Sequence, residues 1–141
     1  MAELNIAAKT EKLSEVIGFV EEQLEAVNCP PKTMMQISVA VEEIFVNIAH
    51  YAYAPGEGMA DIVLELSDDN ASVRISFSDS GIPYNPLNND EPDITLSAED
   101  RQIGGLGVFM VKKSMDNVKY EYRDGHNILT IEKALISKKV S

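Results

Sequence analysis

Cysteine, basic side chains and long apolar runs are all scarce in this sequence. The one cysteine, Cys29, excludes an internal disulfide and a zinc site built from several cysteines. No apolar stretch approaches the roughly 18 to 20 residues that a membrane-spanning helix needs. Lys and Arg number 12 against 23 Asp and Glu, so the chain as a whole repels nucleic-acid phosphates and anionic membranes. We therefore expect neither a nucleic-acid nor a membrane partner.

The start of the chain also lacks the basic region and apolar run of a secretory signal. This favours a cytoplasmic setting. The 141 residues suffice for one domain with a single core, so we expect residues 1–141 to form a single domain.

Apolar periodicity predicts the secondary structure. Three- and four-residue steps indicate helices, and alternation indicates strands. In chain order we expect a strand over 4–8, a helix capped by Thr10 with apolar residues from Leu13 to Val27, a helix over 31–54, a hairpin of 61–67 with 72–78, a polar loop over 79–102, a helix from Leu106 to Met115, and a hairpin of 118–123 with 127–133.

This order of elements differs from the regular strand–helix alternation of a doubly wound parallel sheet. It favours the α+β class, as a two-layer sandwich with helices on one face of a mixed, mostly antiparallel sheet. Tyr120 and Tyr122 alternate along one predicted strand, and we interpret them as sheet packing.

An acid and an amide lie one turn apart on the second predicted helix. Glu43 and Asn47 flank its apolar face and are able to point into the same cleft. A carboxylate polarises a hydroxyl or water, and an amide oxygen is a neutral hard ligand suited to magnesium. A solvated polar flank is the alternative interpretation.

Asp79 and Gly81 leave the end of an apolar strand and enter the polar loop. A carboxylate there is able to accept a hydrogen bond from an exocyclic amine such as that of adenine. Gly81 lets a flat base approach the backbone. An ordinary Asp-Ser-Gly turn is the alternative.

A glycine-rich segment, Gly104, Gly105, Leu106 and Gly107, opens the third predicted helix. Free N–H groups and the positive end of a helix converge there, which favours phosphate binding. The segment matches neither the P-loop nor the Rossmann fingerprint. A glycine hinge without a ligand is the alternative.

Taken together, the three motifs resemble those of the ATP-binding domains shared by gyrase, Hsp90, histidine kinases and MutL. Residues 42–50 (EEIFVNIAH) are similar to the N-box of that family, 79–86 (DSGIPYNP) to its first glycine box, and 104–111 (GGLGVFMV) to its second. The resemblance covers nearly the whole chain. The branch it resembles most is the bacterial stand-alone anti-sigma factor serine/threonine kinases.

The resemblance implies a Bergerat-type ATP-binding fold that takes ATP and Mg²⁺. It implies that Asn47 ligates magnesium, Glu43 is the base towards a serine hydroxyl, and Asp79 reads the adenine amine. It also places Gly81 against the ring and the glycines on the phosphates. Glu42 is the rival acid, but it lies about 100° from Glu43 around the helix, so we assign it outward.

Two further positions follow from the same resemblance. Arg101, just before the glycines, is placed to reach a terminal phosphate, with a role on the lid surface as the alternative. At the start of the final predicted strand, where relatives often have Gly-Thr, we align His126-Asn127. The contact that the threonine usually makes with the adenine region is then made by Asn127 or is absent.

The expected function is a protein serine/threonine kinase that controls transcription. In the resembling branch the substrate is an anti-sigma factor antagonist protein, and binding to a sigma factor is the competing activity, so phosphorylation switches partners. Those kinases are commonly dimers, which makes a homodimer an expectation. The alternative is a non-catalytic module whose bound nucleotide sets its affinity for partners.

Overall fold

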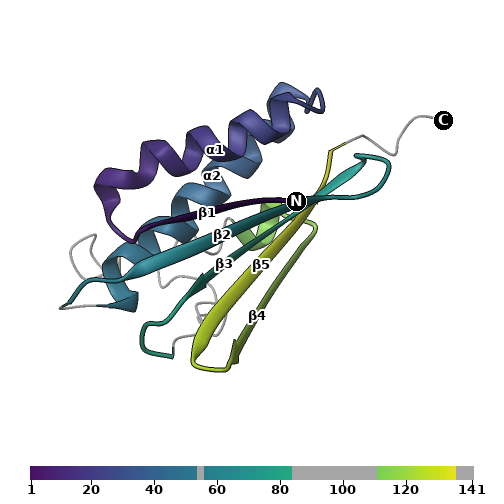
Figure 1. The fold of residues 1–141 in the computed structure, drawn as a ribbon. Helices are drawn as coiled ribbons and strands as arrows, with labels where there is room; N and C mark the ends of the chain where they lie inside the picture. Colours follow the sequence, from purple (N-terminus) through teal and green to yellow (C-terminus); the bar gives the residue numbers. More distant parts are fainter. Residues whose placement is uncertain (54–55, 84–110, 136–141) are drawn as a thin grey trace, which may run out of the picture.

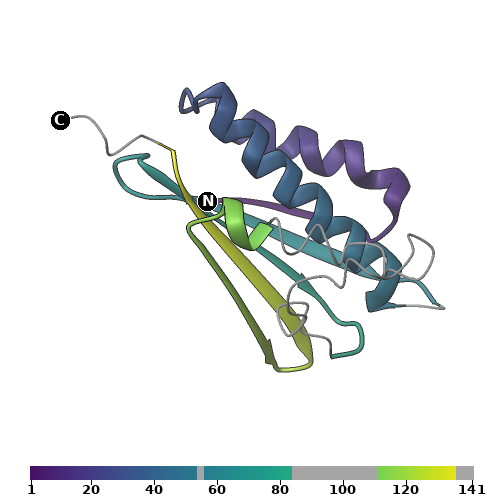
Figure 2. The same ribbon diagram turned by 180° about the vertical axis from the view of Figure 1, so that it is seen from behind.

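The computed structural model describes residues 1–53, 56–83 and 111–135, and it has two layers. Helices α1 (Leu13–Glu25) and α2 (Pro31–Asn47) lie together on one face of a sheet, in the view of Figure 1 and from behind in Figure 2. The strands are β1 (Ala2–Ala7), β2 (Met59–Leu66), β3 (Ser72–Asp79), β4 (Asn117–Arg123) and β5 (His126–Ala134). Their order is β1-β2-β3-β5-β4, and every pairing among them is antiparallel. The predicted α+β sandwich is confirmed, with a sheet whose described strands are all antiparallel where we had expected a mixed one.

Helix α1 forms as its apolar spacing predicts. Val16, Val20 and Leu24 are fully buried against the core. After the helix ends at Glu25, Asn28 has a left-handed φ of 57°, and the N–H of Cys29 donates to the carbonyl of Leu24 at 3.1 Å. This satisfies a carbonyl of the last turn that would otherwise lack a partner.

The predicted capping role of Thr10 is wrong. Thr10 lies inside a 3₁₀ turn, η1 (Thr10–Lys12), and makes no side-chain cap hydrogen bond. A cap residue needs an extended backbone, and here Lys9, one residue earlier, has it (φ −130°, ψ 142°). Helix α1 therefore follows directly from the 3₁₀ turn.

Helix α2 begins at Pro31, as the fixed φ of proline at a first helical position favours. Its α-helical part ends at Asn47 and continues as a π-helix, η2 (Ile48–Ala52), where we had expected one helix to residue 54. Short π-helical segments of this kind are frequent at functional sites.

None of the helices in the described ranges is both long and apolar enough to cross a membrane.

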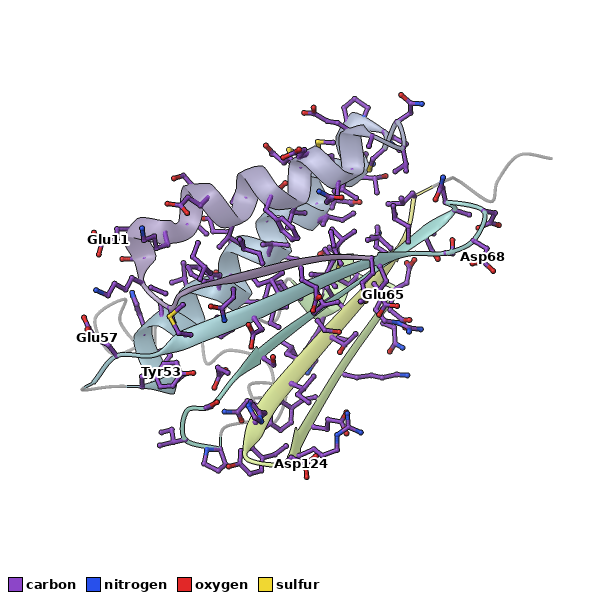
Figure 3. The ribbon with its side chains drawn as sticks, in the orientation of Figure 1. Glu11, Tyr53, Glu57, Glu65, Asp68 and Asp124 are labelled. Atoms are coloured by element: carbon purple, nitrogen blue, oxygen red, sulfur yellow. The ribbon has the colours of Figure 1, made fainter. Side chains whose placement is uncertain are left out.

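Both predicted hairpins form. β2 and β3 bring Ile62, Leu64, Val73, Ile75 and Phe77 into the core. β4 and β5 are joined by a two-residue turn in which Asp124 and Gly125 both have positive φ, the pairing that Asp-Gly favours. Figure 3 shows Asp124 at this turn and Asp68 at the β2–β3 turn, at opposite ends of the sheet.

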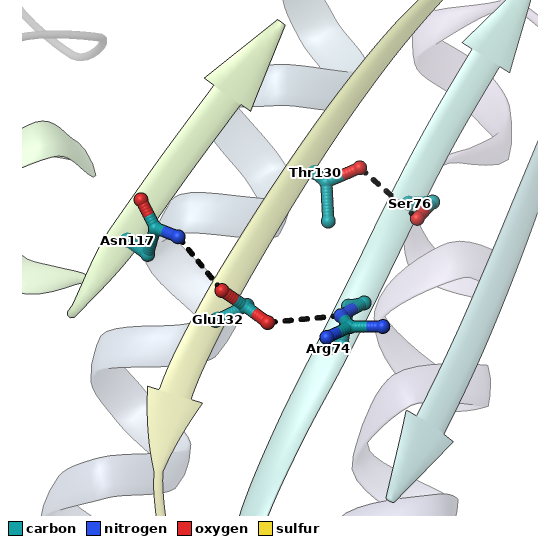
Figure 4. Close-up of polar contacts among 5 residues, drawn as sticks. All are labelled: Arg74, Ser76, Asn117, Thr130 and Glu132. Atoms are coloured by element: carbon teal, nitrogen blue, oxygen red, sulfur yellow. Dashed lines mark hydrogen bonds and ion pairs between the residues drawn. The ribbon is translucent and has the colours of Figure 1, made fainter.

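The outer face of the sheet, away from the helices, carries a polar network. The Glu132 carboxylate on β5 accepts hydrogen bonds from Asn117 on β4 at 2.8 Å and from Arg74 on β3 at 2.9 Å (Figure 4). Ser76 and Thr130 are paired at 3.2 Å on the same face. These bonds cross three neighbouring strands and hold β4 to the sheet.

Candidate nucleotide-binding site

A pocket lies between the end of α2 and the strands β3, β5 and β4. Aliphatic and aromatic side chains form most of its wall, and a few polar groups converge on it, which is the usual composition of a small-molecule site. Its lining in the described part of the chain is Ile44, Asn47, Ile48, Tyr51, Ala52, Phe77, Asp79, Ile82, Val111, Val118, Tyr120, Asn127 and Leu129. Three predicted site residues, Asn47, Asp79 and Asn127, are therefore brought together.

Asp79 is the last residue of β3 and is buried. Its Oδ1 accepts the N–H of Gly81 at 2.9 Å and the Nδ2 of Asn127 at 3.0 Å. Within the described ranges, its second oxygen, Oδ2, accepts no hydrogen bond. A buried carboxylate oxygen left in that state is costly, so it suits a ligand that donates.

Gly81 has a structural reason to be glycine. A Cβ at this position would come 2.1 Å from the backbone oxygen of Ala52. The same oxygen accepts the N–H of Ile82 at 3.0 Å. The end of the π-helix is thus held against the segment that leaves β3. The predicted contact of Gly81 with a base stays a prediction.

Asn127 lies opposite Asp79 in the β3–β5 register. It is buried, and its Nδ2 donates both to Asp79 and to the backbone oxygen of Ile82 at 2.8 Å. The hydroxyl of Tyr120 donates to its Oδ1. Tyr120 therefore does more than pack in the sheet, as we had interpreted it, because it also orients Asn127. The sequence does indicate that these two residues lie close together. With a two-residue turn, Tyr120 lies diagonally across from Asn127 on the same face.

Asn47 lines the pocket at the junction of α2 and the π-helix. Its Nδ2 donates to the backbone oxygen of Glu43, one turn earlier, at 3.0 Å. This bond leaves the amide oxygen Oδ1 as the group available to a cation. Glu43 is half-buried, and burial together with the neighbouring Glu42 raises the pKa of its carboxyl. Glu42 is exposed, as predicted.

Glu43 itself is not among the described residues that line the pocket. Arg101, Gly104, Gly105, Leu106 and Gly107 lie outside the described residues, so their roles stay predictions. Of the helix expected over 106–115, residues 111–114 are described and helical, and Val111 and Met115 are buried.

Sequence reasoning missed Tyr53, which joins the segment that leaves β3 next to Asp79 to the start of β2. Its hydroxyl accepts the N–H of Ser80, next to Asp79, at 2.7 Å and donates to the carbonyl of Met59. Figure 3 shows Tyr53 beside the start of β2. No motif in the sequence marks this residue, because its partners are backbone groups from two distant segments.

Residues 6–133 match the model of the histidine kinase-like ATPase domain. Serine/threonine-protein kinase BtrW of Bordetella bronchiseptica is 32% identical over 95 residues, which are 67% of this chain and 66% of that protein. Serine-protein kinase RsbW of Listeria monocytogenes is 30% identical over 99 residues, 66% of this chain and 61% of that protein. These matches span less than two thirds of the length of each kinase.

Solved structures show the same fold at low sequence identity. The crystal structure of RsbU and RsbW domains from Mycobacterium tuberculosis has a TM-score of 0.67 at 17% identity, covering 100% of this chain and 35% of that one. A SiaB–SiaC complex from Pseudomonas aeruginosa gives 0.60 at 18% identity, covering 96% of this chain and 90% of that one.

Proposed function

The chain belongs to the family of histidine kinase-like ATPase domains, and from this premise we propose that it binds ATP with magnesium and phosphorylates a serine or threonine of a partner protein. The observation that carries the nucleotide proposal is the Oδ2 of Asp79. Asp79 is buried and lines a mostly apolar pocket, and this oxygen accepts no hydrogen bond from the described residues. The exocyclic amine of adenine is a donor that fits it.

The apolar walls suit the base itself. Ile48 and Leu129 line the pocket with Asp79, and Ile82 lines it although its side chain is 60% exposed. A flat aromatic ring is bound by such walls through apolar contact, while one polar group at the end of the pocket fixes its orientation. In this arrangement the Asp79 carboxylate recognises the base by accepting a hydrogen bond from it.

Asn47 is the residue that fits magnesium. Its amide oxygen is a neutral hard ligand, and the bond of its Nδ2 to Glu43 fixes which end of the amide faces outward. Magnesium, when bound, neutralises phosphate charge. That effect matters here because the chain has a net charge of −11. We assign the phosphates to the glycines Gly104, Gly105 and Gly107, with Leu106 and Arg101 beside them.

Glu43 is the proposed base. Partial burial raises the pKa of its carboxyl, and a carboxylate with a raised pKa accepts a proton more readily than one in bulk water. It takes the proton of the attacking hydroxyl as the new P–O bond forms and the bond to the leaving ADP breaks.

The proposed partners follow from the relatives. Because kinases named BtrW and RsbW are similar to this chain, we assign it an anti-sigma factor antagonist as substrate and a sigma factor as the competing partner. A homodimer and a cytoplasmic location belong to the same proposal. It is an analogy from fold and sequence, and the site residues support only the nucleotide part directly.

One observation favours a second function. Glu43 lies outside the described lining of the pocket, so a module that binds ATP without transferring phosphate would have the same pocket. In that case the bound nucleotide sets partner affinity, and the Glu43 carboxylate has no chemical role.

A labelling experiment separates the two functions. The purified chain is incubated with magnesium, ATP labelled on its terminal phosphate, and a candidate anti-sigma factor antagonist from the same organism. We expect label on the antagonist, loss of transfer but not of ATP binding in Glu43→Gln, and near-normal transfer in the matched control Glu42→Gln. If the unmodified chain binds ATP but transfers no phosphate, the second function, a module that only binds ATP, is supported. Absence of ATP binding would reject both.

A further inference from the structure

We propose that Tyr120 and Asn127 form a positioning pair that fixes the Asp79 carboxylate and thereby sets the preference of the pocket for a 6-amino purine over a 6-oxo purine. The inference rests on the proposed nucleotide binding and concerns this chain's own residues at that site. Three hydrogen bonds carry it: Tyr120 to Asn127, Asn127 to Asp79, and Asn127 to Ile82.

The amide of Asn127 is oriented from both ends. Its Nδ2 faces two acceptors, the Oδ1 of Asp79 and the backbone oxygen of Ile82, and its two hydrogens match them. Its Oδ1 faces a donor, the hydroxyl of Tyr120. Turning the amide over would place oxygen against two oxygens, so this orientation is the stable one.

The oriented amide in turn selects one oxygen of Asp79. Oδ1 is held by Asn127 and by the N–H of Gly81, which stops the carboxylate from rotating about its Cβ–Cγ bond. Oδ2 is left as the oxygen of this pocket-lining residue that is able to accept a hydrogen bond from a ligand. An amine at position 6 of a purine donates to that oxygen, whereas a carbonyl oxygen there is repelled by it.

Asn127 acts through Asp79 in this arrangement. Both hydrogens of its Nδ2 are used within the protein, so its effect on the ligand passes through the carboxylate. Asn127 and Tyr120 are therefore positioning residues, and Asp79 is the residue that contacts the base.

The test compares ADP with inosine diphosphate, which differs at position 6 of the purine by a carbonyl in place of the amine. Affinities are measured by calorimetric titration in the presence of magnesium. For Asn127→Leu we expect ADP affinity to fall about tenfold and inosine diphosphate affinity to change little. Tyr120→Phe, which leaves the amide in place, should lose about threefold in the same selective manner.

Tyr122→Phe is the matched control, since Tyr122 lies two residues away on the same strand, is 45% exposed and does not line the pocket. It should bind both nucleotides as the unmodified chain does. Thermal unfolding of each variant checks that the fold persists, and an equal loss of both nucleotides would indicate a structural effect and overturn the inference.

A double-mutant cycle tests the route through Asp79. In an Asp79→Asn background, Asn127→Leu should cause no further loss of ADP preference, because the carboxylate that it positions is gone. A full additional loss would mean that Asn127 contacts the base itself. If the unmodified chain binds ADP and both variants keep its preference, this inference fails while nucleotide binding stands. If the unmodified chain binds neither nucleotide, the proposed function fails.

Discussion

The backbone oxygen of Ala52 occupies the space that a side chain on Gly81 would need, 2.1 Å from the position of its Cβ. Ala52 ends the π-helix that follows Asn47, and Gly81 follows Asp79. The contact therefore joins the proposed magnesium ligand and the proposed base-reading residue through two short backbone segments.

Gly81→Ala should destabilise the chain by about 1 to 3 kcal/mol, since the obstructing atom is backbone and cannot rotate away. Urea unfolding measures this. Gly18→Ala on α1 is the matched control because a Cβ there meets nothing within 4 Å. It should stabilise by about 0.5 to 1 kcal/mol. Equal effects of the two substitutions would contradict the steric account.

Tyr53→Phe removes a hydroxyl that serves two backbone groups, the N–H of Ser80 and the carbonyl of Met59. We expect a loss of about 1 kcal/mol in the free energy of unfolding. Nucleotide affinity should fall as well, because Ser80 adjoins Asp79. The checks are urea unfolding and calorimetric titration with ADP. Unchanged affinity would show that the hydroxyl does not position the pocket.

Glu43→Gln should stabilise the fold at neutral pH while it removes transfer. Burial, with a smaller effect of Glu42, raises the pKa of Glu43 in the folded chain above the usual 4.5. The folded state then binds the proton more tightly than the unfolded state, and stability falls as pH rises from about 4.5 through the raised pKa.

The gain from Glu43→Gln is expected to be at most about 1 kcal/mol after solvent screening. It should be present above the raised pKa and vanish below pH 4.5. Thermal unfolding across this pH range measures it. Glu22→Gln on the exposed side of α1 is the control. Loss of stability in Glu43→Gln at neutral pH would contradict the sign.

Glu132→Gln should destabilise with the opposite pH profile. Hydrogen bonds from Asn117, and then from Arg74, lower the pKa of the Glu132 carboxyl. The ionised carboxylate contributes to the stability of the fold at pH values above its pKa in the unfolded chain. This contribution disappears as pH falls through the lowered pKa of the folded chain. We expect a loss of about 0.5 to 1 kcal/mol at pH 7, because exposed ion pairs are screened.

The control for Glu132 is Glu121→Gln on β4, where the exposed carboxylate pairs only with Arg123 of the same strand, at 3.6 Å, among the described residues. Thermal unfolding at pH 7 and at pH 3 compares the two. A loss for Glu132→Gln that persists unchanged at low pH would show that the carboxylate charge is not its source.

Sequence periodicity predicted both main helices and both hairpins, because each is encoded by local spacing and by turn residues such as Asp124 and Gly125. The three motifs, through their resemblance to the ATP-binding family, predicted that Asn47, Asp79 and Asn127 belong to one site. Neither predicted the π-helix after Asn47 or the roles of Tyr53 and Tyr120. The role of Tyr53 depends on backbone groups from two distant segments, which local spacing does not reveal. The contact of Tyr120 follows from the register of the β4–β5 hairpin, which we did not use when we interpreted this residue as sheet packing.

The sheet order has a consequence for folding kinetics. β2–β3 and β4–β5 are local hairpins, whereas β3 and β5 pair across a long stretch of chain, with Asp79 and Asn127 separated by 48 positions. Closing that loop costs more chain entropy than closing either hairpin, so we expect both hairpins to form before they join. Because the base-reading carboxylate and its partner meet only at that junction, nucleotide affinity should return only after both hairpins have formed when the unfolded chain is diluted out of urea.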